Sequence, residues 1–93
     1  MTSVELSELA IDLRLNYKLD TELTWNNKFP LTVFRSKNSR TVKVKFDNIL
    51  KTYDLAIVKE HPKDAVTLED YTEYEKRLTK KEAILRIVKV LGL

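Results

Sequence analysis

The 93-residue chain contains no cysteine, one histidine and one glycine. Without cysteine the chain can form no disulfide, no thiolate metal site and no thiol nucleophile. Gly92 is its only glycine, whereas Walker and dinucleotide loops need several glycines beside a strand–helix junction. A single histidine excludes sites built from paired imidazoles, and one histidine with scattered carboxylates does not indicate a metal site. We therefore expect no metal, no nucleotide and no other cofactor.

His61 is the only conventional general base near neutral pH. Its neighbours, residues 60 and 62–64, are Glu, Pro, Lys and Asp, which is a polar loop composition. A hydrolytic site would also need a nucleophile, and no nucleophile-elbow sequence is present. We therefore interpret His61 as a solvated loop residue and predict that the protein is not an enzyme.

Long apolar runs are also missing. No segment approaches the roughly 18 apolar residues that cross a bilayer, and residues 1–5 lack the basic and apolar regions of a secretion signal. Together with the absence of cysteine, this predicts a cytoplasmic protein with no membrane partner. Apolar residues make up 43% of the chain and charged residues 33%, which is typical of a chain that folds, here as one domain over residues 1–93.

The charges that are present occur in blocks. The chain has 17 basic and 14 acidic residues, a net charge of +3. Residues 28–45 hold six basic residues and no acid, and residues 76–93 hold six basic residues and one acid. Acidic residues outnumber basic ones in residues 1–27 and 46–75. A concentrated basic segment can attract an anionic partner even where the net charge is small.

The N-terminal pattern allows two structures. Every odd residue from Leu9 to Leu19 is apolar and every even residue from Asp12 to Asp20 is polar, which is typical of a half-buried antiparallel strand. We predict a short helix over 3–8 followed by a strand near 10–19. Because leucines at helical spacing also form one stripe, residues 9–19 remain open to either strand or helix.

Residues 31–46 read as a β-hairpin with strands near 31–37 and 40–46. With Asn38-Ser39 as a two-residue turn, Lys37 would pair with Arg40 and one face of the hairpin would be apolar. Asn-Ser favours such a turn less than Asn-Gly does, so a longer loop is the alternative. The pairing predicts exposed Thr32, Lys43 and Lys45, and it predicts burial of Leu31, Val33, Val42, Val44 and Phe46.

The C-terminal half is less determined. Alternation over 53–59 allows a further strand, although the same residues would also make a helical face. Residues 67–91 are predicted to be helical, with Thr67 and Asp70 as an N-terminal cap pair. Thr79 and Glu82 have a second capping-box spacing, so the segment forms either one helix or two. The predicted fold class is α+β: a small antiparallel sheet with the helical C-terminal segment packed on its apolar face.

The polar face of the hairpin is the candidate binding site. Phe34 would lie opposite Lys43, which combines a positive charge for phosphates with an aromatic ring for a base, as single-stranded nucleic-acid binding requires. A basic hairpin tip could instead enter a duplex groove. The structural alternative is that lysine stems cover Phe34 and the cations keep the strand soluble. The candidate nucleic-acid-binding residues are Phe34, Arg35, Lys37, Arg40, Lys43 and Lys45, with Lys80 and Lys81 as a second contact.

Two functions follow from these patterns. The first is a small non-catalytic accessory protein that binds single-stranded or duplex nucleic acid. The second is a protein-interaction or assembly module, with itself or another protein as partner, in which complementary charge blocks pair. The cations of 28–45 and 76–89 distinguish the two: convergence on one face favours nucleic acid, and opposed blocks with an exposed apolar edge favour assembly.

Overall fold

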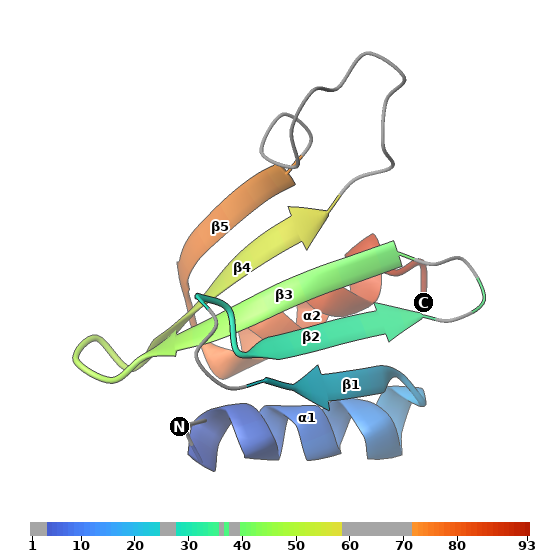
Figure 1. Ribbon diagram of the computed structural model, residues 1–93, viewed down its shortest axis with the longest axis horizontal. Coiled ribbons are helices and arrows are strands. Elements are labelled where there is room, and N and C mark those ends of the chain that lie inside the picture. The colour runs from blue at the N-terminus through green and yellow to red at the C-terminus, as the bar shows by residue number, and fades with distance from the viewer. Residues whose placement is uncertain (1–3, 25–27, 36, 38–39, 59–71) are drawn as a thin grey trace.

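The computed structural model describes residues 4–24, 28–35, 37, 40–58 and 72–93. His61, the Thr67–Asp70 cap pair and the Asn38-Ser39 turn lie outside these residues. The described elements form a single α+β domain in which each strand pairs antiparallel with its neighbour along the chain (Figure 1). In chain order they are α1 (Val4–Tyr17), β1 (Asp20–Leu23), β2 (Leu31–Arg35), β3 (Arg40–Asp47), β4 (Thr52–Val58), β5 (Thr72–Leu78) and α2 (Lys80–Val90).

The predicted strand near 10–19 is wrong, because most of this segment belongs to helix α1. The helix buries a stripe against the sheet and leaves Ile11 53% and Leu15 75% exposed. Leucine favours helix, and this spacing aligns the buried residues on one face without using the full alternation. The chain reverses at Lys18, whose φ is 54°, and strand β1 begins only at Asp20. The stripe consists of Leu6, Leu9, Ala10 and Leu13.

The hairpin of β2 and β3 has the predicted faces but a different register. Val33 pairs with Val42 rather than Val44, and Arg35 pairs with Arg40. Four residues, 36–39, separate the strands, since the chain offers no glycine for a tight two-residue turn there. A shift of two residues keeps each side chain on its predicted face. Leu31, Val33, Val42 and Val44 are accordingly buried, and Phe46 packs against the core while remaining partly exposed.

The strand allowed over 53–59 is confirmed as β4, whereas the helix predicted over 67–91 is only partly correct. Residues 80–90 form α2, which begins at the predicted capping box: Thr79 Oγ1 accepts the Glu82 N–H, and the Glu82 carboxylate accepts the Thr79 N–H. The segment before this box is strand β5. Its backbone pairs with β4, and its acidic side chains suit a solvated edge strand as well as a first helical turn.

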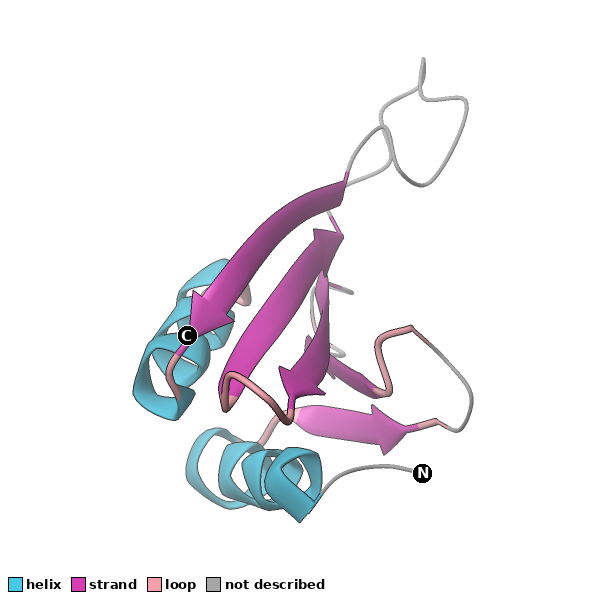
Figure 2. Ribbon diagram, turned by 90° about the vertical axis from the view of Figure 1, so that its left-hand side faces the viewer, coloured by secondary structure: helices cyan, strands magenta, loops and turns pink. Residues whose placement is uncertain are grey.

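Both helices cover the same face of the sheet (Figure 2), and neither helix of the described residues covers the other face, which is called the open face below. Neither helix in the described part of the chain is long and apolar enough to span a membrane. Each fully buried leucine contributes about 1.5–3 kcal/mol relative to exposure. The core between helices and sheet comprises Leu6, Leu9 and Leu13 of α1, Ala83 and Ile87 of α2 with Leu91, and Leu31, Val33, Val42, Val44, Tyr53, Leu55 and Ile57 of the strands.

Two leucines of α1 test the helix directly. Leu13→Ala should lower the free energy of unfolding by about 2–5 kcal/mol because it opens a cavity in the core. Leu15→Ala should change it by no more than about 0.5 kcal/mol, since that side chain is exposed. Urea denaturation of the two variants measures both values. Similar losses for both would indicate that residues 13 and 15 share a buried face, as they would in a strand.

Candidate binding face of the sheet

The open face of the sheet is formed by the strand side chains that point away from α1 and α2. On β2 and β3 these side chains alternate with the buried valines, so Lys43 and Lys45 lie on the open face. Tyr74 lies there too, because β5 pairs it with Ala56 of β4. The side chains of β2 to β5 on the open face include Thr32, Phe34, Lys43, Lys45, Asp54, Tyr74 and Lys76.

An aromatic pair lies on this face. The Thr24 N–H donates to the Pro30 carbonyl at 2.7 Å, which brings together the two ends of the segment between β1 and β2. Phe29, beside that contact, is only 8% exposed, and its ring centroid lies 6.2 Å from that of Tyr74. Tyr74 itself is 49% exposed. A buried ring therefore supports a second ring that remains available to a ligand.

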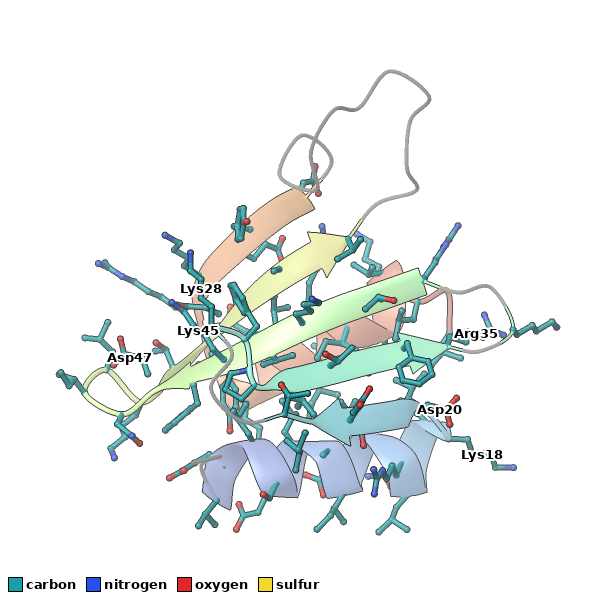
Figure 3. The ribbon with its side chains drawn as sticks, viewed as in Figure 1. Lys18, Asp20, Lys28, Arg35, Lys45 and Asp47 are labelled. Atoms are coloured by element: carbon teal, nitrogen blue, oxygen red, sulfur yellow. The ribbon has the colours of Figure 1, made fainter. Side chains whose placement is uncertain are left out.

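Three lysines surround the aromatic pair. Lys28, Lys45 and Lys76 line a cavity of about 340 Å³ together with Phe29, Tyr74 and Asp54. The Lys45 ammonium lies 5.5 Å from the Phe29 ring centroid, a cation–π distance. Figure 3 shows Lys28 and Lys45 close together over β3. The cavity thus joins three positive charges and an exposed ring around one carboxylate.

That carboxylate, Asp54, organises the cavity. Its Oδ1 accepts the backbone N–H of Arg77 at 3.0 Å, and its Oδ2 lies 3.7 Å from the Lys45 ammonium. The register between β4 and β5 shifts at this point, so that two residues of β5, Lys76 and Arg77, oppose Asp54. Arg77 has a φ of 61°. The resulting bulge re-aims the strand, as bulges do beside functional sites.

Two of the residues predicted from the hairpin share this face but are not direct neighbours. Lys43 pairs with Thr32 and Ala56 rather than with Phe34. Phe34 pairs with Thr41 because of the two-residue register shift. On its other side it pairs with Asp20 of β1. It borders a shallow groove of about 610 Å³ along β1, where the acidic Asp20 and Glu22 are balanced by Arg14 and Lys18. The predicted Phe34–Lys43 pair is therefore wrong, although both side chains occupy the open face.

The two predicted arginines lie elsewhere. Arg35 Nη1 donates to the carbonyls of Leu91 and Gly92, each at 3.2 Å, and Arg40 Nη1 donates to the Val90 carbonyl at 3.3 Å. These carbonyls lie at the C-terminus of α2, where the helix dipole favours cations. Both arginines thus join the hairpin to α2. Lys37 is exposed in the connection between β2 and β3, outside the cavity.

Lys80 and Lys81 lie on the helix side of the molecule. The Lys80 ammonium lies 2.8 Å from Oδ2 of Asp12 and so connects α2 to α1. This hydrogen bond raises the pKa of Lys80 above its usual value. Lys81 borders a separate depression with Tyr17 and Ile84. The structure does not bring these two lysines together with Lys43 and Lys45. The two basic blocks converge in part only: Lys76 of the second block meets Lys28 and Lys45 of the first.

Sequence analysis missed the residues at the centre of the cavity. Phe29 and Lys28 precede Pro30, and nothing in their order indicates that they fold over the sheet. Tyr74 and Lys76 alternate as strand residues do, but a helix was predicted for that segment. Reading residues 72–78 as a strand places both on one face.

Asp47, outside the cavity, has a structural role. The Asp47 carboxylate accepts the N–H groups of Leu50 and Ile49, which lowers its pKa and holds the turn after β3. Within the described ranges no three acidic or histidine side chains come close enough to hold a metal ion. The lysine and aromatic cavity is therefore the candidate binding site.

Comparison of the chain with models of known protein families, with characterised proteins and with solved structures found no significant match. The open face is therefore the part of the molecule from which a function can be inferred. Geometry can identify a class of ligand through its charge and shape, even where fold alone does not identify a function.

Arg35 on the helix side and Lys43 on the open face should differ in their contribution to the free energy of unfolding. Arg35→Ala should lower the free energy of unfolding by about 1 kcal/mol, because it removes charge-assisted hydrogen bonds at a partly exposed helix end. Lys43→Ala should leave it within about 0.5 kcal/mol. Thermal or urea denaturation measures both. Equal stability of the two variants would show that Arg35 does not hold the end of α2.

Proposed function

We propose that the protein is a small non-catalytic accessory protein that binds single-stranded nucleic acid on the open face of its sheet. The observation that supports this most directly is Tyr74, half-exposed over Phe29, with Lys28, Lys45 and Lys76 around it. An exposed ring offers a stacking surface to a base, and lysines beside it neutralise the flanking phosphates. Both requirements are met within one cavity.

The shape of the cavity favours a single strand over a duplex. At about 340 Å³ it lies at the small end of ligand-sized sites. Its aromatic rings lie on a sheet face rather than on a protruding helix or tip. A base in a duplex is already stacked on both sides, whereas a base in a single strand has a π-face free to stack on Tyr74.

Charge defines where the bound strand would run. Lys43 continues the positive path from Lys45 along β3. At the β1 edge, Asp20 and Glu22 lie on the same face and offset the charges of Arg14 and Lys18, so that groove has no net positive charge to hold phosphates. The path therefore covers β3 to β5 and stops short of β1, which places Phe34 at its margin.

We also propose that the protein acts in the cytoplasm. A chain without cysteine needs no disulfide and is therefore suited to a reducing compartment.

Lysine and tyrosine variants separate charge from stacking. Lys76→Ala should weaken binding of a single-stranded oligonucleotide and reduce the slope of log affinity against log salt by about 0.7. Tyr74→Leu should weaken binding by about 1–3 kcal/mol while leaving the slope unchanged, because it removes a stacking surface and no charge. Fluorescence anisotropy at several salt concentrations measures both quantities.

Lys81→Ala is the matched control, because it removes an exposed lysine from the helix side. It should change neither affinity nor slope by more than the small non-specific contribution of one remote charge. The proposal fails if the wild-type protein binds no tighter than about 10⁻⁴ M at low salt. It fails equally if Lys81→Ala weakens binding as much as Lys76→Ala, since the open face would then have no special role.

A further inference from the structure

A second aromatic ring, that of Phe34, lies on the open face outside the cavity. Phe34 projects from β2 to the same side of the sheet as Thr32 and is partly exposed. Its ring borders the groove along β1, whereas Tyr74 of β5 lines the cavity. Exposed rings on a solvated face are surfaces on which bases can stack. The open face therefore presents two such surfaces, which stand apart from one another.

The register of the sheet sets the spacing of the two rings. One row of paired residues crosses the sheet from Tyr74 on β5, through β4 and β3, to Thr32 on β2. Phe34 lies two residues beyond Thr32 on β2. From the ordinary strand spacing and rise per residue, the Cα atoms of Phe34 and Tyr74 are about 16 Å apart. Neighbouring nucleotides of a stacked strand are only about 3.4 Å apart, so a strand that used both rings would place non-adjacent bases on them.

The surface between the two rings combines short side chains with one lysine. Ala56, only 4% exposed, lies between Tyr74 and Lys43 in the row of paired residues. Lys43 pairs with Thr32 on its other side and is therefore a diagonal neighbour of Phe34. Diagonal neighbours in a sheet are about 7–8 Å apart, within the reach of a long side chain. A phosphate that linked a base on one ring to a base on the other would thus pass beside Lys43.

We propose that Phe34 is a second base-stacking surface, so that one single strand crosses the sheet diagonally from Tyr74 to Phe34. This inference rests on the proposed function and adds to it the length and conformation of the ligand. One base stacks on each ring, at least one nucleotide lies between them, and Lys43 neutralises a phosphate of the linking segment. The ligand is therefore an unstacked strand of three or more nucleotides, and weakly stacking pyrimidine runs meet this requirement best.

The charges around Phe34 make it the end of this path. The groove that begins at Phe34 and follows β1 is lined by Arg14 and Lys18 as well as by Asp20 and Glu22. These charges cancel, so the groove offers no net attraction to further phosphates. The bound segment therefore extends from the cavity to Phe34 and does not continue across β1.

Oligonucleotides of two lengths separate the two stacking surfaces. A thymidine dinucleotide and a thymidine octamer each compete with a fluorescent octamer for the full-length protein, which gives both affinities. Phe34→Leu should weaken the octamer about fivefold or more and leave the dinucleotide unchanged, because the dinucleotide occupies the cavity alone. Tyr74→Leu should weaken both. Phe34→Tyr keeps a ring at this position and should bind the octamer as the wild type does.

Tyr17→Leu is the matched control, because it removes a partly exposed ring from the helix side and should change neither affinity. If Phe34→Leu alters octamer binding no more than this control does, the second stacking surface is ruled out, while the loss in Tyr74→Leu still supports the proposed function. Equal losses for dinucleotide and octamer in Phe34→Leu would also overturn the inference, since Phe34 would then act through the fold of the cavity. A wild type that binds neither oligonucleotide overturns the proposed function and this inference together.

Discussion

The central constraint on this protein is that both helices cover the same face of the sheet. Alternate side chains along a strand point to opposite faces, so most strand residues that meet α1 and α2 are apolar and most of the intervening ones are polar. The open face is thereby free to carry charge and exposed rings without cost to the core. Phe29 covers part of that face from the segment before β2, and its burial supports the exposed Tyr74.

The same constraint sorts the basic residues into two kinds. Arg35 and Arg40 stand on the helix side of the hairpin and satisfy carbonyls at the end of α2. Lys80 forms an ion pair that joins the two helices. On the open face, Lys28, Lys45 and Lys76 gather at one cavity, where Lys45 pairs with Asp54. A basic block in a sequence therefore mixes cations that stabilise the fold with cations that remain available to a ligand.

Sequence reasoning predicted the α+β class, the faces of β2 and β3 and the capping box of α2, because each rests on a local pattern or a two-residue period. It could not choose between helix and strand for residues 10–19, since leucines at odd positions satisfy both periods and only packing on the sheet decides. For residues 72–78 the acids that suit a first helical turn also suit an edge strand. The cavity was missed because Phe29 and Tyr74 are 45 residues apart in the chain and meet only through the sheet.

Tyr74 connects the edge strand β5 with the segment before β2. Its ring packs on Phe29 within the cavity. Lys76 in turn lines the cavity from which phosphates would be neutralised. A base stacked on Tyr74 would therefore contact a ring whose position depends on two segments far apart in the chain, with Lys76 beside it for a phosphate. Nucleic-acid binding and the packing of Phe29 on the sheet would thus stabilise one another.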